Sequence, residues 1–395
     1  MIRYDTIKAL VQQCTHEICS MRRHIHENPE LSNEEVNTAA YMAKMLQSFG
    51  IETKENVAGT HAVLGTLTGG KPGPTIAVRT DMDALPITEE TGLSFASKQP
   101  GVMHACGHDG HMAILLGTAK VLSALKDELA GTVLFVCQPA EEKSPAGGAK
   151  ALVQAGVLDG IQAIYGFHMW PNLPTGQIGV RTGAMMAASD HVRVVIHGKA
   201  SHAAMPHKGV DAVVTAGQFI TAAQDIVSRQ INPLYPVVLT FGRISGGTRY
   251  NIVADTVELE GTCRTYDKEA QNLVETNLGN ILKGLDLMYG TTSELYYERG
   301  YAAVVNAPKQ AAFIADTVTE CFGEQALADV QEPAMTAEDF SGYLQAYEGG
   351  FYWLGTTKPG QPMYPLHNSH FTLDEASLPI GVALMAKLVC NALSQ

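Results

Sequence analysis

Residues 111–137 read HMAILLGTAKVLSALKDELAGTVLFVC, and the fold class can be inferred from their pattern. His111–Ala124 is predicted to form a helix, and the apolar run Val133–Cys137 is typical of a buried strand. Another apolar run, Thr75–Arg79, precedes this helix along the chain. Buried strands that alternate with helices favour an α/β structure built around a largely parallel sheet.

The sequence on both sides of this stretch continues the same pattern. Further apolar runs lie at Ala62–Leu67 and Ala163–Phe167, and a helical segment at Lys150–Ala155 precedes the second of them. The first part of the chain predicts two helices that are separated at Asn28-Pro29. We therefore expect helices on both faces of the sheet.

A different pattern begins after Met186 and extends to about Gly300. It predicts strands at 191–197, 237–244, 256–265 and 294–299 and helices at 210–229 and 269–289. The order βαββαβ is that of a compact α+β unit of the ferredoxin-like type. We therefore predict a main α/β domain of residues 1–186 and 301–395, interrupted by an inserted domain of residues 187–300.

The composition excludes several classes of protein. The chain has 395 residues, which suits two domains, and 46% hydrophobic with 17% charged residues is typical of a soluble globular protein. A net charge of -13 and the lack of a Lys/Arg-rich run argue against binding to nucleic acid or to an anionic membrane. The N-terminal segment lacks a signal-peptide pattern, and no apolar stretch reaches the ~20 residues of a bilayer span. Together with seven scattered cysteines, these features predict a cytoplasmic protein.

A segment rich in metal-binding side chains lies just before the predicted helix at 111–124. Residues 104–111 read HACGHDGH and contain three histidines, a cysteine and an aspartate. Cys106 and His108 are two residues apart, and thiolate and imidazole are common ligands of zinc and similar ions. The alternative is a solvated loop that is rich in histidine by chance. On its own, this segment favours one or two metal ions.

Two adjacent carboxylates, Glu141 and Glu142, follow the apolar run 133–137 closely. Adjacent carboxylates repel each other unless a positive charge holds them, and a metal ion can supply that charge. One of the two can then bind the ion while the other transfers protons. The alternative is a helix N-terminus, where the helix dipole favours acidic residues.

Three further polar residues end or follow apolar segments, or lie near the C-terminus: His168, Asp81 and His367. Taken alone, a histidine in either position is more often structural than a ligand, and Asp81 is equally consistent with a loop cap. Open α/β sheets build their sites at the carboxyl ends of strands, where Asp81 could orient a ligating histidine. Two adjacent metal ions need about five or six protein ligands. The sequence offers five candidates, namely Cys106, His108, Glu142, His168 and His367.

Taken together, these motifs resemble those of a known enzyme family. The chain resembles the hippurate hydrolase and indole-acetyl-amino-acid hydrolase group, N-acyl-L-amino-acid amidohydrolases of the aminoacylase/carboxypeptidase G metallopeptidase superfamily. The resemblance runs nearly end to end and implies that the inserted domain serves as a lid and dimerisation domain. The matching segments are RHIHENPE at 23–30, RTDMDALP at 79–86, MHACGHDGH at 103–111, QPAEE at 138–142, AAMPH at 203–207, EDF at 338–340 and LHNSH at 366–370.

The resemblance implies a site with two divalent metal ions. Cys106 would bridge them, at a position where other branches of the superfamily have Asp. His108 and His168 would complete the ligands of one ion, and Glu142 and His367 those of the other. Zinc or manganese is expected, with cobalt or nickel as alternatives.

The resemblance also implies roles for five further residues. Glu141 would act as the general base and then protonate the leaving amine, and Asp81 would orient the site. In the inserted domain, His202 would stabilise the oxyanion, and in relatives this histidine comes from the partner subunit. Asn251 and Arg264 would hold the carboxylate end of the substrate. The expected assembly is a homodimer or a dimer of dimers.

The expected activity is metal-dependent hydrolysis of N-acyl amino acids, either hippurate-like or N-acetyl substrates, to a carboxylic acid and a free amino acid. Deacetylation of N-acetyldiaminopimelate is the alternative within the family. Two alternatives belong to other classes: a cysteine hydrolase with Cys106 as the nucleophile, and a non-catalytic metal-dependent binding protein. Segments 143–148 and 198–201 depart from the family pattern, which bears on fine substrate preference.

Overall fold

The computed structural model describes residues 2–395 and divides into two compact units. The first unit runs up to Met185 and also includes Val304–Pro333 and Asp339–Gln395. The second unit consists of Met186–Ala303 and Ala334–Glu338. The chain thus leaves the first unit, builds most of the second and then returns. Among the described residues, no helix is both long and apolar enough to cross a membrane.

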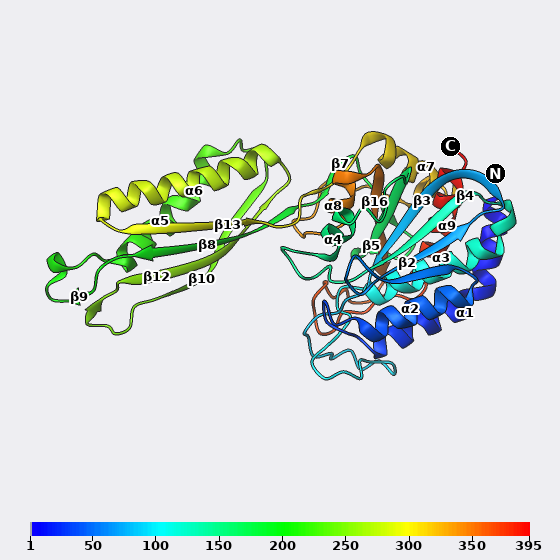
Figure 1. The fold of residues 1–395 in the computed structure, drawn as a ribbon, viewed down its shortest axis with the longest axis horizontal. Helices are drawn as coiled ribbons and strands as arrows, with labels where there is room; N and C mark the ends of the chain where they lie inside the picture. Colours follow the sequence, from blue (N-terminus) through cyan, green and yellow to red (C-terminus); the bar gives the residue numbers. More distant parts are fainter. Residues whose placement is uncertain (1) are drawn as a thin grey trace. The chain divides into compact units, whose positions relative to one another are not determined.

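The first unit is built on an eight-stranded sheet with the order β1-β2-β4-β3-β5-β16-β6-β15 (Figure 1). The strands are β1 (Glu52–Val57), β2 (Ala62–Thr68), β3 (Lys71–Asp81), β4 (Ala130–Gln138), β5 (Ala163–Pro174), β6 (Ile178–Gly179), β15 (Leu327–Ala328) and β16 (Gly349–Thr357). The four central strands β4, β3, β5 and β16 run parallel, and antiparallel pairings occur toward the edges. The prediction of an α/β fold with a largely parallel sheet is confirmed.

Helices lie on both faces of this sheet. They are α1 (Tyr4–Glu27), α2 (Val36–Ser48), α3 (His108–Ala124), α4 (Gly148–Gln154), α7 (Pro308–Phe322), α8 (Ser341–Ala346) and α9 (Ser377–Ala392), and short strands β7 (Gly183–Met186) and β14 (Val304–Asn306) pair separately. Successive side chains of strand β5 pack against residues on opposite faces of the sheet. Tyr165 and Phe167 belong to the apolar cluster with α1, α3 and α9, whereas a Cβ on the intervening Gly166 would lie 2.6 Å from the Phe340 ring. Burial on both faces explains the continuous apolar sequence of this strand.

Helices α1 and α3 illustrate two patterns of burial, and the end of α1 follows from its sequence. In α1, the buried Ile7, Val11 and Ile18 recur at helical spacing. The helix ends at Glu27, two residues before Pro29, because proline cannot continue a helix and restricts the residue before it. In contrast, α3 is buried around nearly its whole circumference, which is typical of a core helix.

The second unit has the element order β8, α5, β10, β12, α6, β13, with bounds β8 (Ala188–His197), α5 (Ala212–Asp225), β10 (Val237–Gly246), β12 (Thr256–Thr265), α6 (Lys268–Tyr289) and β13 (Thr292–Arg299). Its antiparallel sheet has the order β10-β12-β8-β13, and α5 and α6 pack on one face (Figure 1). Val192, Val194 and Ile196 of β8 point into this core, whereas Arg193 lies outside it. This alternation is typical of a half-buried strand.

Candidate metal centre and active site

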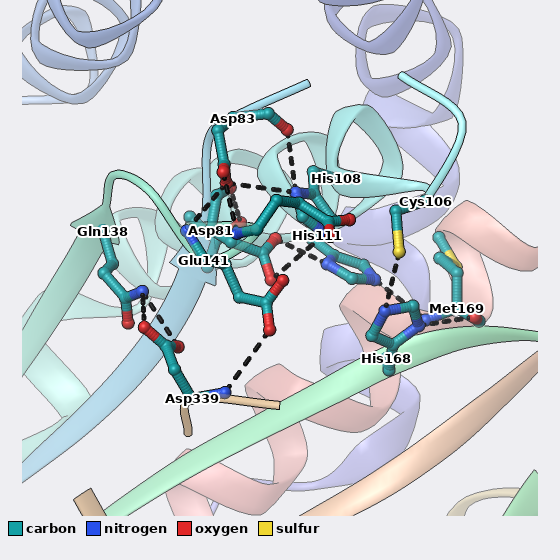
Figure 2. A network of polar contacts seen from close by, with 12 residues as sticks. Asp81, Asp83, Cys106, His108, His111, Gln138, Glu141, His168, Met169 and Asp339 are labelled. Atoms are coloured by element: carbon teal, nitrogen blue, oxygen red, sulfur yellow. Dashed lines mark hydrogen bonds and ion pairs between the residues drawn. The ribbon is translucent and has the colours of Figure 1, made fainter. Parts of the chain in front are cut away.

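Polar residues of the candidate site lie at the carboxyl ends of β3 and β4 and within the neighbouring strand β5. Strand β3 ends at Asp81, which pairs with Gln138, the last residue of β4. His168 lies in β5, the other neighbour of β3. Helix α3 begins at His108, directly after Gly107, whose φ of 92° is left-handed and therefore suits glycine. In Figure 2 the side chains of Asp81, His108 and His168 lie close together, whereas Gln138 points toward Asp339.

Two groups of potential ligands share the sulfur atom of Cys106. In the first group, Cys106 Sγ lies 3.4 Å from His168 Nε2. A ring nitrogen of His108 lies within 4.8 Å of both atoms. In the second group, Cys106 Sγ lies 3.3 Å from His367 Nε2, which lies 3.1 Å from Glu142 Oε1. The structure therefore brings together all five predicted ligands, in the two sets that the family resemblance implies.

The geometry of each group fits a metal ion. A tetrahedral ion with bonds of about 2.3 Å to sulfur and 2.0 Å to nitrogen holds these two atoms roughly 3.5 Å apart. The observed S···N separations are 3.4 and 3.3 Å. His168 and His108 direct Nδ1 at the backbone oxygens of Met169 (2.7 Å) and Asp83 (2.8 Å), so Nε2 keeps its lone pair. Among the described residues, the buried His108 Nε2 has no hydrogen-bond partner, as expected of a ligand atom.

The charges at the site favour a bound cation. Burial and the carboxylate of Glu142 raise the pKa of the Cys106 thiol well above its usual range. Burial alone would lower the pKa of His108, but the negative charges of Asp81 and Asp83 raise it to about 10. Both shifts reflect negative charge that is buried with too little positive charge beside it. A divalent cation would supply that charge and stabilise the thiolate.

The paired glutamates are held through their backbone. Asp83 Oδ1 accepts a hydrogen bond from Glu141 N at 3.0 Å, and Asp83 Oδ2 accepts one from Glu142 N at 2.9 Å. The Glu141 side chain is buried, and its Oε1 accepts from Asp339 N at 3.3 Å (Figure 2). Glu142 instead faces His367. The two carboxylates thus have different neighbours, which permits Glu142 to bind an ion while Glu141 transfers protons.

The hydrogen-bond partner of Asp81 differs from the expected one. Asp81 Oδ1 lies 2.7 Å from His111 Nδ1, and His111 Nε2 accepts from Met169 N at 2.8 Å. The proton of His111 is therefore on Nδ1 and is donated to Asp81. The predicted ligand His108 has its Nε2 3.7 Å from Asp81 Oδ2 and donates to the backbone of Asp83 instead. Asp81 therefore contacts the histidine that lies about one helical turn beyond the predicted ligand.

A buried arginine supports this arrangement, and sequence analysis does not single it out. Arg79 donates to Asp81 Oδ2 at 2.7 Å, to Asp339 Oδ1 at 2.6 Å and to Gln138 Oε1 at 2.9 Å. Gln138 Nε2 in turn donates to Asp339 (Figure 2). Burial alone would raise the pKa of Asp81, but the neighbouring rings of His108 and His111 and the guanidinium of Arg79 hold it well below its usual range. Arg79, Gln138 and Asp339 all lie in segments that match the family. This match is the only signal for them in the sequence.

His202 and Asn251 are neighbours within the second unit. His202 lies in strand β9 (Ser201–His202), which pairs with β11 (Ile252–Val253), and Asn251 directly precedes β11. His202 Nδ1 accepts a hydrogen bond from Ala204 N at 3.0 Å. The neutral ring must therefore carry its proton on Nε2. The side chain is exposed, so this N–H can donate to a ligand.

Arg264 lies in β12 of the four-stranded sheet, at the end that is remote from the separate β9–β11 pair. It pairs with Ser189 near the start of β8, whereas β9 follows the end of β8 at His197. Eight residues of extended strand span about 27 Å. Within one chain, therefore, a small molecule cannot contact both Arg264 and His202.

A profile of Peptidase family M20/M25/M40 matches residues 77–391, which include every predicted site residue. The chain belongs to this family. It is a hydrolase that acts on linear amides. This assignment agrees with the family resemblance of the sequence motifs.

Relatives of this M20-family hydrolase match it over most of their length. An N-acyl-L-amino acid amidohydrolase of Geobacillus stearothermophilus is 45% identical over 302 residues, 76% of this chain and 81% of the relative. An N-acetyldiaminopimelate deacetylase of Streptococcus sanguinis is 38% identical over 374 residues, 94% of this chain and 97% of the relative. The solved structure of the YXEP protein of Bacillus subtilis, a dinuclear metal-binding peptidase from the M20 family, is 35% identical with a TM-score of 0.85 and covers 97% of this chain and 99% of its own.

Proposed function

We propose that this hydrolase cleaves the amide bond of N-acyl amino acids with two divalent metal ions, releasing a carboxylic acid and a free amino acid. The observation that carries the proposal is the pair of ligand groups that share Cys106, with the buried carboxylate of Glu141 beside them. Similarity to an N-acyl-L-amino acid amidohydrolase supports the substrate class. Similarity to a dinuclear metal-binding peptidase supports two ions.

Different side chains would bind the metal ions and transfer the proton in this reaction. Cys106 would bind both ions, with His108 and His168 on one and Glu142 and His367 on the other. When bound, the two cations polarise the scissile carbonyl group and make a water molecule more acidic. Glu141 accepts the proton of that water and then transfers it to the leaving amine nitrogen. The thiolate favours zinc, while manganese, cobalt and nickel are alternatives for the same ligands.

The second unit would bind the substrate and the developing negative charge. Arg264 and Asn251 offer a guanidinium and an amide group for the substrate carboxylate. His202 offers its Nε2–H for the oxyanion. Because Arg264 and His202 lie far apart within the second unit, they would reach one substrate from two different chains. The proposal therefore includes a homodimer, or a dimer of dimers, in which each site uses both subunits.

His202→Ala is expected to lower kcat by about 10²–10³-fold, because one donor to the oxyanion is lost. Metal content and thermal stability should stay close to the wild-type values, since the side chain is exposed. The measurements are kcat, KM and the unfolding temperature. His207→Ala, which changes another exposed histidine of the same loop, is the matched control and should be nearly neutral. An unchanged kcat in His202→Ala would remove this residue from the mechanism.

A mixing experiment tests the use of two subunits. His202→Ala and Arg264→Ala should each be nearly inactive alone. When the two variants are unfolded and refolded together, half of the dimers are mixed and each mixed dimer has one intact site, so about a quarter of wild-type activity should return. If the mixture stays as inactive as its components, the shared site is wrong.

The substrate class is tested by metal analysis and a panel of benzoyl-glycine, several N-acetyl amino acids and N-acetyldiaminopimelate. We expect hydrolysis to disappear on chelation and to return with zinc or manganese. A clear preference for N-acetyldiaminopimelate would favour the second candidate function, which the deacetylase relative supports. Turnover that survives complete metal removal would contradict the proposal and favour Cys106 as a nucleophile, although a buried thiol with a raised pKa is a poor one. Binding without turnover would indicate a binding protein.

A further inference from the structure

Residues 140–142 form a turn whose three consecutive backbone N–H groups all donate to buried carboxylates. Asp83 accepts the bonds from Glu141 and Glu142. The third acceptor is Glu35, whose Oε1 accepts from Ala140 N at 2.7 Å. Glu35 is fully buried and directly precedes α2, far from this turn in the sequence. None of the mechanistic steps above uses Glu35.

The backbone of Ala140 explains why this turn needs a fixed acceptor. Ala140 has a φ of 57°, in the left-handed region that is unfavourable for a residue with a Cβ atom. Ala140 lies between Gln138, where β4 ends, and Glu141. A residue held there without a fixed partner would return to a more favourable conformation, and Glu141 would move with it.

Besides Ala140 N, the Glu35 carboxylate interacts with backbone N–H groups of its own segment, at Asn33 and Glu35. It makes no capping hydrogen bond to α2, although it occupies the position before that helix. The first turn of α2 is instead held by Glu30, which accepts from Asn37 N at 3.2 Å and Thr38 N at 2.8 Å. Glu35 and Glu30 therefore lie in the same connection between α1 and α2, and only Glu35 reaches the turn that carries Glu141.

We propose that Glu35 is a positioning residue for catalysis: by accepting the Ala140 N–H it holds Ala140 in the left-handed conformation and so aims the Glu141 carboxylate at the reacting water. This inference rests on the proposed role of Glu141 as general base. An amide oxygen can accept the same bond, so Gln should replace Glu35. Burial raises the pKa of Glu35 to about 7, which agrees with an acceptor that does not depend on a full negative charge.

The test compares Glu35→Gln, Glu35→Leu and the matched control Glu30→Leu, each loaded with metal. Glu35→Leu removes the acceptor and should lower kcat on the order of 10²-fold with little change in KM, as expected when a catalytic group is misplaced. Glu35→Gln should keep most of the wild-type kcat. Glu30→Leu should lower the stability of α2 but not kcat per folded molecule. Equal losses in Glu35→Leu and Glu30→Leu, or in Glu35→Leu and Glu35→Gln, would overturn the proposal.

A second substitution tests the conformational reason directly. Glycine adopts a positive φ without strain, so Ala140→Gly should make the turn less dependent on Glu35. The double variant Glu35→Leu/Ala140→Gly should therefore recover part of the kcat that Glu35→Leu loses. If Ala140→Gly recovers nothing, Glu35 does not act through the conformation of Ala140.

Hydrogen exchange separates this inference from the proposed function. The amide of Ala140 should exchange faster in Glu35→Leu, but not in Glu35→Gln or Glu30→Leu, whether or not a substrate is known. If the wild-type protein hydrolyses no N-acyl amino acid while this pattern is seen, the proposed function fails and Glu35 still positions the turn. If the wild type is active and Glu35→Leu changes neither exchange nor kcat, the inference about Glu35 alone is wrong.

Discussion

Replacing Glu141 by Gln is expected to lower kcat by about 10²–10⁴-fold while both metal ions stay bound. Gln has the same size, and its oxygen can still accept the hydrogen bond from Asp339 N that Glu141 Oε1 accepts. It cannot, however, take a proton from water and transfer it to the leaving amine. The measurements are kcat at saturating metal and the metal content of the purified variant.

Glu142→Gln is the matched control, because it changes the adjacent carboxylate in the same turn. Glu142 Oε1 lies 3.1 Å from His367 Nε2, so this substitution should weaken metal binding, and added metal should restore part of the activity. Glu141→Gln should therefore lose turnover but keep its metal, whereas Glu142→Gln should lose metal and regain part of its activity when metal is added. If Glu141→Gln loses metal and Glu142→Gln does not, the roles of the two residues have to be exchanged.

Cys106→Ala is expected to reduce the bound metal from about two ions to fewer than one per chain and to bring activity below detection. The reason is that both ligand groups use the same sulfur atom, which lies 3.4 Å from His168 Nε2 and 3.3 Å from His367 Nε2. Without it, each group keeps only two predicted protein ligands. Metal analysis after gel filtration and activity at several metal concentrations would measure the effect.

Two further variants separate the loss of a bridge from the loss of a thiol. Cys390→Ala removes a buried thiol from the apolar core of the first unit and should leave metal content and kcat unchanged. Cys106→Asp places a carboxylate where the resemblance finds Asp in other branches, and should restore part of the metal binding. If Cys106→Ala kept both ions and lost only turnover, the sulfur would be a nucleophile and not a ligand.

The grouping of the candidate residues could be anticipated from the sequence where they lie in a local motif. Cys106 and His108 are recognisable because they are close together in a loop before a helix, and the paired glutamates because they follow an apolar strand. The α/β sheet could also be predicted, since buried parallel strands are continuously apolar. The rule that sites form at the carboxyl ends of such strands then places Asp81 and His168 at one edge.

Contacts between distant segments could not be predicted in the same way. Arg79 reaches Asp339, which lies 260 positions further along the chain, and nothing in either segment specifies that pair. The hydrogen bond from His111 to Asp81 was missed for another reason. His108 and His111 are one turn apart on α3, and the sequence does not tell which of them faces the carboxylate. The link between Glu35 and Ala140 is of the same long-range kind.

The position of β16 has a consequence for the order in which the protein is made. This strand lies in the middle of the large sheet, where Ile164 of β5 pairs with Gly349 of β16, yet it is synthesised after the whole second unit. At 5–20 residues per second, the edge of β5 waits for its partner for roughly 10–40 s, while the inserted unit can complete its own sheet. An open edge of this kind is prone to wrong pairing on the ribosome. Because His168 lies on β5 and His367 follows β16, a nascent chain cannot assemble the full set of predicted ligands until residue 367 has been made.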